Sequence, residues 1–384
     1  MDFEFSTSNR IIFKTKGILE LGNHALKLGT YPFIVTGKNK NRLKPLLAAL
    51  KHVSMDYVLF SVEDEPDINQ IREAVKLALD SSCNMVIGFG GGSALDSAKA
   101  IAILMNNPGD ILDYLEIIGK NQEIKSPHLP LILIPTTSGT GSEVTKNSVL
   151  TDTNTKIKVS LRSPMMLADL VFIDPALTVS MPPQITSSTG LDALTQVIEP
   201  FVSSYANPIT DTFCREGIKR ISSSLKKAYQ NGNDITARED MALGSLFGGL
   251  ALANSKLGAV HGFAGVIGGK FGAPHGFICA ALLPNVIKVN INALKSRNLE
   301  SQALSRYTEL SQILLGKENA LPEDCLIWLE ELYSALKVEG LSKYGITQDL
   351  LDEIIEKSAS SSSMKGNPIT LTYEEMKEIL VSSL

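Results

Sequence analysis

The sequence has few cysteines, and no two of them lie close together along the chain. Its 384 residues include only four, and these lie far apart without a Cys-x-x-Cys motif. This pattern favours reduced thiols over a disulfide framework or a zinc knuckle. Reduced thiols are typical of the cytoplasm, where we expect the protein to work. The four are Cys83, Cys214, Cys279 and Cys325.

The chain also lacks a net positive charge, and it has no long apolar runs. The formal net charge of -5 leaves no cationic surface for nucleic acid or for an anionic membrane. The longest apolar runs, such as residues 131–134, are too short to cross a bilayer. Asp2 and Glu4 stand where a secretion signal would carry a basic and then an apolar region. We therefore expect neither a nucleic-acid partner nor a membrane.

The remaining composition is that of a globular protein, with 44% hydrophobic and 20% charged residues. A chain of this length predicts two hydrophobic cores. In the first half, β-rich runs alternate with helical patterns, which is typical of a parallel sheet covered by helices. From Pro182 and Pro183 onward, Ala- and Leu-rich segments recur at helical spacing, at residues 191–202, 211–229 and 237–252. We predict an α/β domain over residues 1–181 and an all-helical domain over residues 182–384.

A glycine cluster follows the expected strand at residues 85–88. Residues 88–96 read Gly-Phe-Gly-Gly-Gly-Ser-Ala-Leu-Asp and open an expected helix, whose free N–H groups would receive a diphosphate. Ser93 would add a hydroxyl donor, and Asp96 would cap the helix or orient the loop. A tight turn without a ligand gives the same pattern, which is neither a P-loop nor a clean Gly-x-Gly-x-x-Gly motif.

A second polar loop follows the next expected strand. Residues 135–143 read Pro-Thr-Thr-Ser-Gly-Thr-Gly-Ser-Glu, and these hydroxyl groups suit a sugar or the nicotinamide amide. An ordinary Ser/Thr turn is the alternative. Two such loops after successive parallel strands would meet at one edge of the sheet, and this convergence favours a ligand.

Two of the five histidines, His261 and His275, share one glycine-rich stretch. Upstream, Asp192 and Gln196 are four residues apart and would share one face of a helix. Asp and His side chains suit a divalent metal such as Fe²⁺ or Zn²⁺. The alternative is that the histidines are satisfied core or capping residues and that Asp192 is a helix cap. The spacing alone does not separate these interpretations.

Six co-linear motifs resemble the iron-containing alcohol dehydrogenase family, also called group III alcohol dehydrogenases, which has a dehydroquinate synthase-like fold. They are GGGSALDSAKA, PTTSGTGSEVT, DPALT, GLDALTQVIEPFVS, ANPITD and LGAVHGFAGVIGGKFGAPHG, and the resemblance covers nearly the whole chain. It implies a Rossmann-like N-terminal domain, a helical C-terminal domain and an active site in the cleft between them. It also implies an NAD(P)-dependent alcohol dehydrogenase or aldehyde reductase that forms a homodimer or a larger homo-oligomer.

The resemblance assigns roles to residues. The glycine cluster would hold the diphosphate, the second loop the adenosine and nicotinamide side, and Lys158 the nicotinamide ribose. A divalent metal would act as a Lewis acid, whereas the motifs identify no proton donor. The implied cofactor-binding residues are Gly37, Gly91, Gly92, Ser93, Asp96, Thr136, Thr137, Ser138, Thr140, Ser142 and Lys158. The implied metal ligands are Asp192, Gln196, His261 and His275, with Asp192, His261 and His275 acting in catalysis through the metal.

Two departures from the family pattern concern the metal site. Gln196 stands where members with a firmly bound iron usually carry His, and a neutral amide is a weaker donor than imidazole. The identity of the metal and its occupancy therefore stay open. Gly265 stands where several relatives carry another His that has been considered for proton relay, which excludes a relay through this position.

A third departure concerns the cofactor. Gly37 stands where many NAD-preferring relatives carry an Asp that accepts hydrogen bonds from the ribose 2′-OH. With Lys38, Lys40 and Arg42 nearby, its absence would remove repulsion against a 2′-phosphate, so we expect either NAD or NADP to bind.

Three alternatives stand beside a metal-dependent dehydrogenase of a small alcohol or aldehyde. Gln196 favours a metal-independent reductase of the maleylacetate reductase type. A lyase like dehydroquinate synthase shares the architecture, although the sequence lacks the motifs of that family. A non-catalytic nucleotide-binding relative is the third. No charged cluster indicates a carboxylate or phosphate substrate.

Overall fold

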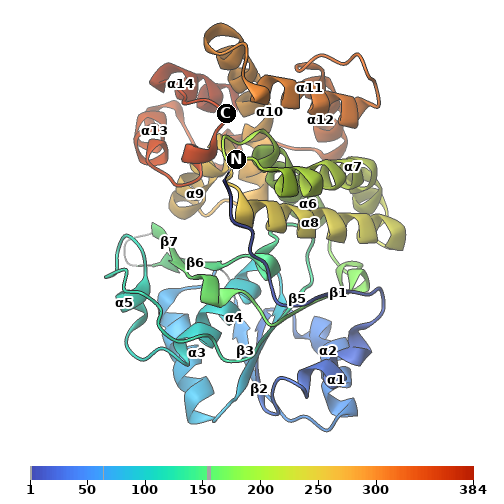
Figure 1. The fold of residues 1–384 in the computed structure, drawn as a ribbon, viewed down its shortest axis with the longest axis vertical. Helices are drawn as coiled ribbons and strands as arrows, with labels where there is room; N and C mark the ends of the chain where they lie inside the picture. The colour runs from blue at the N-terminus through green and yellow to red at the C-terminus, as the bar shows by residue number, and fades with distance from the viewer. Residues whose placement is uncertain (1, 64, 154–156) are drawn as a thin grey trace. The chain divides into compact units, whose positions relative to one another are not determined.

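The computed structural model describes residues 2–63, 65–153 and 157–384. The chain divides into two compact units (Figure 1). One unit consists of Ser6–Thr137 and Gly141–Ser180 and contains every strand found in the described residues. The other consists of Met181–Leu384, Ser138–Thr140 and the N-terminal segment up to Phe5, and its regular structure is helical.

The first unit is built on a six-stranded parallel sheet. Its strand order is β1-β8-β5-β4-β2-β3, and each neighbouring pair is parallel. The β-rich runs of the sequence lie in or overlap β2 to β5, so the predicted class, a parallel sheet followed by a helical part, is confirmed. The strands are β1 (Ile11–Phe13), β2 (Pro32–Gly37), β3 (Val58–Val62), β4 (Met85–Gly90), β5 (Leu131–Pro135) and β8 (Leu170–Ile173).

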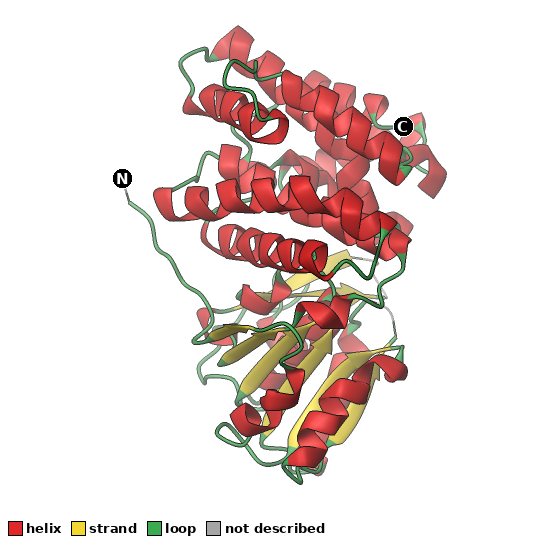
Figure 2. Cartoon of the chain, turned by 90° about the vertical axis from the view of Figure 1, so that its right-hand side faces the viewer, coloured by secondary structure: helices red, strands yellow, loops and turns green. Residues whose placement is uncertain are grey.

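Helices cover both faces of this sheet (Figure 2). On one face, α1 (Leu21–Ala25) and α2 (Lys44–His52) share a buried core with alternate strand residues such as Ile87. On the other face, α4 (Gly92–Leu104), beside α3 (Ile68–Asp80), packs closely on β4. A Cβ at Gly88 would lie 2.7 Å from Ala98 Cβ, so glycine is required for this close approach.

A two-stranded antiparallel hairpin, which we did not predict from the sequence, lies against α4. It consists of β6 (Asn147–Asp152) and β7 (Ile157–Arg162). Asp96 of α4 holds it, because its carbonyl oxygen accepts a hydrogen bond from Ser148 Oγ at 2.8 Å and its Oδ2 accepts one from Val149 N at 2.9 Å.

The helical unit has one continuous apolar core. Its first helix begins at Pro183, where a missing N–H costs no helical hydrogen bond. The helical segments predicted at residues 191–202, 211–229 and 237–252 lie within α6, α7 and α8. The helices are α6 (Pro183–Val202), α7 (Pro208–Gln230), α8 (Ile235–Asn254), α9 (Ala259–Phe271), α10 (His275–Arg297), α11 (Gln302–Leu315), α12 (Asp324–Leu336), α13 (Leu351–Ala359) and α14 (Tyr373–Ser382).

Helix α10 is longer and more apolar than the runs we expected from the sequence. The helix has 23 residues, and an apolar window of 18 of them has a mean hydropathy of 1.6, which would suffice to cross a membrane by length and composition alone. However, 67% of that apolar window is buried inside the protein. It packs against α6, α9 and α14, and a buried core helix of a globular unit has the same composition.

Two oppositely charged residues are buried where α4 meets the loop after β5. Lys99 Nζ donates to Ser142 O and to Thr145 Oγ1, each at 2.9 Å, and pairs with Asp96 Oδ1 at 2.9 Å. Glu143 is only 3% exposed. Burial raises the pKa of its carboxyl to about 7, and its backbone hydrogen bond and the charge of Lys99 offset this only in part.

We expect Glu143 to make the protein less stable as the pH rises. Below its ordinary pKa of 4.5 the carboxyl is protonated in both the folded and unfolded states, whereas above about 7 the folded state carries a buried charge. A shift of this size corresponds to roughly 3 kcal/mol. Glu143→Gln should therefore remove much of the fall in the free energy of unfolding between pH 4.5 and 7, measured by urea denaturation at a series of pH values.

The matched control is Glu331→Gln, because Glu331 is exposed on α12. This control should leave the pH dependence unchanged. An unaltered pH dependence in Glu143→Gln would show that the Glu143 carboxyl titrates near its ordinary value.

Candidate metal and cofactor site

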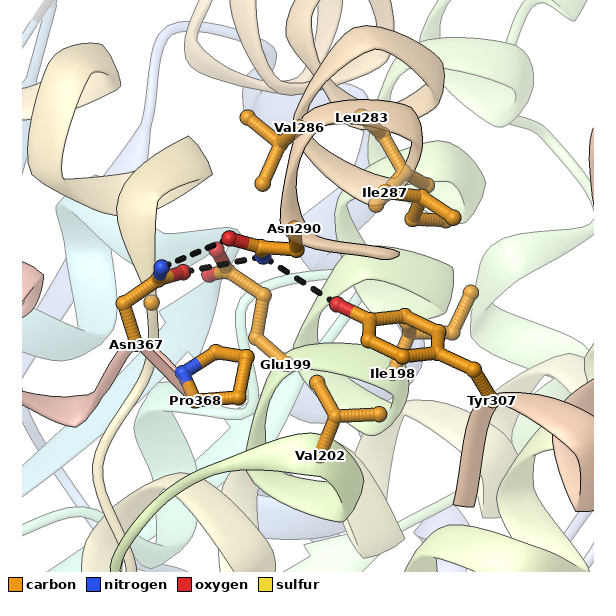
Figure 3. Close-up of a pocket in the computed structure, with 11 residues that line it drawn as sticks. Ile198, Glu199, Val202, Leu283, Val286, Ile287, Asn290, Tyr307, Asn367 and Pro368 are labelled. Atoms are coloured by element: carbon orange, nitrogen blue, oxygen red, sulfur yellow. Dashed lines mark hydrogen bonds between the residues drawn. The ribbon is translucent and has the colours of Figure 1, made fainter. Parts of the chain in front are cut away.

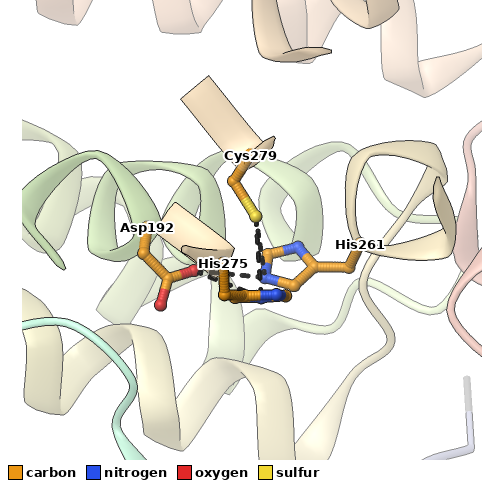
Figure 4. A group of neighbouring side chains, drawn as sticks. All are labelled: Asp192, His261, His275 and Cys279. Atoms are coloured by element: carbon orange, nitrogen blue, oxygen red, sulfur yellow. Dashed lines mark hydrogen bonds and ion pairs between the residues drawn. The ribbon is translucent and has the colours of Figure 1, made fainter. Parts of the chain in front are cut away.

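Four side chains that can bind metal meet inside the helical unit (Figure 4). They are Asp192 of α6, His261 of α9, and His275 and Cys279 of α10, and one atom from each lies within 4.8 Å of the others. The sequence predicts the first three, and the structure brings these three together. Cys279 joins them as a residue that we did not predict.

The helices explain why these residues converge. His275 is the first residue of α10, and Cys279, four residues later, lies on the same helical face. Helix α9 ends at Phe271, and Gly272 follows with a φ of 63°, a left-handed conformation that suits glycine. The chain therefore turns sharply between the helix that carries His261 and the helix that carries His275.

The distances within the cluster are short. Asp192 Oδ1 lies 3.4 Å from His261 Nε2 and 3.8 Å from His275 Nε2. Cys279 Sγ lies 3.6 Å from His275 Nε2 and 4.0 Å from His261 Nε2. Asp192, His261 and Cys279 are buried, while 36% of the His275 side chain is exposed. Both imidazoles thus direct Nε2 toward the carboxylate and the sulfur.

Glu199 of α6 orients His261. Its Oε2 accepts a hydrogen bond from His261 Nδ1 at 2.6 Å, and its Oε1 accepts one from Val260 N at 2.7 Å. When the ring is neutral, a proton on Nδ1 leaves the lone pair of Nε2 free on the Asp192 side, which is how an outer carboxylate prepares a histidine ligand. A Cβ at Gly258 would lie 2.8 Å from Glu199 Oε1, so glycine there lets the carboxylate reach the start of α9.

A small cavity of about 10 Å³ lies next to Glu199, with a polar network along its wall (Figure 3). Asn290 Nδ2 donates to Tyr307 Oη and to Asn367 Oδ1, each at 3.1 Å, and Asn367 Nδ2 donates back to Asn290 Oδ1 at 2.7 Å. Asn367 Oδ1 also accepts from Ala259 N at 3.2 Å. Asn367 and Glu199 therefore cap the first turn of α9 together.

The charges of the cluster support one another. Burial opposes ionisation of Asp192, but the adjacent imidazoles of His261 and His275 outweigh it and lower the pKa. Burial also opposes protonation of His261, but Cys279, Asp192 and Glu199 raise its pKa well above the usual value. In turn, His275 and His261 overcome the burial of Cys279 and lower the pKa of its thiol. Three acidic groups, those of Asp192, Glu199 and Cys279, thus lie around the two imidazoles.

Two buried acceptors in this region have no hydrogen-bond donor. They are Oδ1 of Asp192, a residue 3% exposed, and Oε1 of Gln196, a residue 4% exposed. An unsatisfied buried acceptor costs about 1–3 kcal/mol, and a bound cation would remove this cost. Carboxylate, imidazole and thiolate are all ligands of first-row transition metals. The residues present therefore fit a divalent metal.

Many of the predicted cofactor residues lie at the carboxyl edge of the sheet. Strands β2, β4 and β5 end at Gly37, Gly90 and Pro135, and Thr136 N donates to Gly90 O at 2.8 Å. A Cβ at Gly91 would lie 3.3 Å from Thr137 Cγ2. Gly91 is also the N-cap of α4, whose first residues are Gly92 and Ser93. A free helix N-terminus at this edge is a suitable anion site.

Other predicted cofactor residues have protein partners. Asp96 Oδ1 accepts from Ser142 Oγ at 2.5 Å, so Asp96 and Ser142 tie the second loop to α4. Lys158 of β7 forms an ion pair with Glu65. Ser138 and Thr140 belong to the helical unit, where a Cβ at the intervening Gly139 would lie 2.6 Å from Thr189 Cβ.

Comparison with known families identifies the chain. Residues 8–175 match the model of the iron-containing alcohol dehydrogenases, and residues 186–384 match the model of the C-terminal part of the Fe-containing alcohol dehydrogenase family. The chain belongs to the iron-containing alcohol dehydrogenase family.

Long-chain-alcohol dehydrogenase 1 of Geobacillus thermodenitrificans is a relative of this chain. The two are 37% identical over 84% of this chain and 80% of the relative. Choline dehydrogenase of Bacillus subtilis is 32% identical over the same shares. A solved structure of 1,3-propanediol oxidoreductase superposes with a TM-score of 0.93 at 28% identity, covering 100% of both chains.

The comparisons confirm the family, the fold and the enzyme class that the motifs predict. The homologues of this chain are NAD-dependent oxidoreductases of alcohols or aldehydes, and the chain is an oxidoreductase of the same family. The residues that we missed, Cys279 and Glu199, had weak signals in the sequence. Cys279 follows His275 by four residues, a spacing that places two ligands on one helical face. Glu199 follows Asp192 by seven residues, which is close to two helical turns and places both carboxylates on nearly the same face of α6.

We expect Glu199→Gln to lower the free energy of unfolding of the metal-free protein by about 1–3 kcal/mol. The substitution keeps the shape but replaces one acceptor oxygen by an NH₂ group, which then faces either Val260 N–H or His261 Nδ1–H. Thermal and urea denaturation after chelation measure the effect, with Glu331→Gln as the exposed control on α12. Equal stabilities of Glu199→Gln and the unmodified protein would contradict the capping role.

Proposed function

We propose that the enzyme transfers hydride between NAD(H) or NADP(H) and a small alcohol or aldehyde, with a divalent metal held by Asp192, His261 and His275. Gln196 lies beside Asp192 on α6 and is the predicted fourth member of the set. The observation that carries the proposal is the buried Asp192 Oδ1, which lacks a donor and faces two imidazole nitrogens. The metal, Fe²⁺ or Zn²⁺, would supply a Lewis acid for the substrate oxygen.

The chain's own residues would position the metal and the substrate. Glu199 holds His261 with Nε2 facing Asp192, so the ring need not reorient when it binds a metal. The partial exposure of His275 leaves this side of the cluster accessible to a small molecule. We assign no residue as the proton donor.

The cofactor would bind at the carboxyl edge of the sheet. Gly91, Gly92 and Ser93 would hold the diphosphate at the N-terminus of α4. Asp96 and Ser142 would shape the adjoining loop. The other proposed contacts of the cofactor are Gly37, Thr136, Thr137, Ser138, Thr140 and Lys158. In this proposal residues 1–181 form the dinucleotide-binding domain and residues 182–384 the metal and substrate domain.

The names of the relatives include a long-chain alcohol and choline, so family membership leaves the substrate open. We propose a small alcohol or aldehyde, a cytoplasmic enzyme, and a homodimer or larger homo-oligomer without a nucleic-acid or membrane partner. The metal-independent reductase remains the second candidate, and the observation that favours it is the neutral Gln196 in place of an imidazole.

The proposed function is tested by metal analysis and by oxidation of NADH and NADPH with a panel of aldehydes, before and after chelation. We expect about one metal per chain, loss of turnover on chelation and recovery with Fe²⁺ or Zn²⁺. Asp192→Asn should lower kcat/KM by at least about 100-fold, because it removes the charged ligand. The control is Asp80→Asn at the exposed end of α3.

Each other outcome has a definite meaning. Turnover that persists without metal would favour the metal-independent reductase. Absence of turnover with either cofactor would favour the lyase or the nucleotide-binding protein.

We propose that the enzyme tolerates NADP because Gly37 presents no carboxylate to a 2′-phosphate. Nothing lies within 4 Å of a Cβ placed at Gly37, so a side chain fits there. Of the nearby cations, Arg42 is partly committed, because its Nη2 donates to Thr136 O at 2.7 Å and to Leu177 O at 3.1 Å. The exposed Lys38 and Lys40 would add to the attraction for the phosphate.

Gly37→Asp should shift the ratio of kcat/KM for NADH over NADPH toward NADH by about tenfold or more, because a carboxylate binds the 2′-OH and repels the phosphate. Gly37→Asn has the same shape without the charge and should shift the ratio less. An unchanged ratio in Gly37→Asp would remove Gly37 as a determinant of cofactor choice.

A further inference from the structure

The proposed function leaves the identity of the fourth metal ligand open. That function places Asp192, His261 and His275 around a metal, but it assigns the fourth position to the neutral Gln196. In the structure a different side chain, Cys279, completes the cluster. We propose that Cys279 binds the metal as a thiolate and that Gln196 acts as a hydrogen-bond partner of Asp192. This inference rests on the proposed metal site but not on the proposed reaction.

The distances fit a tetrahedral metal. With ordinary zinc bond lengths, two nitrogen or oxygen ligands lie about 3.3 Å apart, and a sulfur lies about 3.6 Å from a nitrogen. The Asp192 Oδ1 distances to the two Nε2 atoms are 3.4 and 3.8 Å. The Cys279 Sγ distances to the same nitrogen atoms are 3.6 and 4.0 Å. Each of these four separations therefore needs to change by about half an ångström or less to hold an ion. The other two, between Asp192 and Cys279 and between the two imidazoles, lie within 4.8 Å.

The other cysteines provide an internal comparison. All four are buried and free, but Cys279 alone is in the ligand cluster of the described residues. Burial raises the pKa of the Cys83 and Cys214 thiols, and it raises that of Cys325 to about 11. Cys279 instead faces two imidazoles from a position four residues after His275. A structural cysteine needs no such neighbours.

Gln196 has a different relation to the cluster. Its amide lies near the Asp192 carboxyl and helps to lower the pKa of that carboxyl, and an amide in this position can orient a ligand from outside. A Cβ at Gly248 would lie 3.2 Å from Gln196 Cβ, so α8 packs closely against the base of this side chain. Replacing an imidazole by a thiolate also changes the preference of the site, because sulfur ligands favour Zn²⁺ among the divalent metals that the family could use.

The decisive experiment uses Co²⁺ as the probe. The full chain is freed of metal by chelation and reloaded anaerobically with one equivalent of Co²⁺. A thiolate ligand gives an intense sulfur-to-cobalt charge-transfer band in the near ultraviolet, which oxygen and nitrogen ligands do not. We expect this band in the unmodified protein, so the first readout needs no variant.

Variants then assign the band. Cys279→Ser should abolish it and weaken Zn²⁺ binding by more than about 100-fold, measured by competition with a chromophoric chelator. Gln196→Ala should keep the band. The matched control is Cys83→Ser, a buried cysteine of the other unit, which should keep both the band and the affinity. Circular dichroism confirms that each variant is folded.

The outcomes separate this inference from the proposed function. One Co²⁺ per chain without the band, or a band that survives in Cys279→Ser, would overturn the thiolate ligand while the metal-dependent reaction stands. A Cys279-dependent band in a protein that turns over no alcohol or aldehyde would support the ligand and overturn the reaction. Absence of metal binding would overturn the inference and leave Cys279 as the partner of two imidazoles.

Discussion

The buried hydrogen bond from His261 to Glu199 is the interaction on which the candidate metal site depends. It spans 2.6 Å and joins α6 to the first turn of α9. One carboxylate thereby satisfies backbone donors at the start of a helix and orients the ring of His261. Because the helix start and the ring orientation share one partner, the position of His261 is coupled to the packing of α6 against α9.

Close approach of the helices is the second constraint, and glycine makes it feasible. A Cβ at Gly276 would lie 2.0 Å from Ser188 O, and one at Gly258 would lie 2.8 Å from Glu199 Oε1. The glycines beside His261 and His275 in the sequence therefore act mainly through their small size. They let α9 and α10 come near enough to α6 for short side chains such as Asp192 and Cys279 to lie within 4.8 Å of each other.

The α/β unit follows a simpler rule. Parallel strands direct their carboxyl ends to one edge of the sheet, so loops that follow successive strands collect there without specific long-range contacts. Thr136 and Gly90 meet in this way through adjacent strands. The hairpin of β6 and β7 is held differently, by the carboxylate and carbonyl of Asp96. Such a contact leaves no periodic pattern in the sequence, and this explains why the hairpin escaped prediction.

The sequence by itself determined strands β2 to β5, the first helices of the helical unit, the glycine loop and three of the four side chains of the cluster. Periodicity records which face of each element is buried, and motif order records the family. Only the tertiary structure decided that Cys279 joins the cluster, that Glu199 orients His261 and that Lys158 pairs with Glu65. These contacts join residues of different elements, and the last two pair residues far apart in the sequence. Their formation depends on how closely those elements pack, which no local pattern encodes.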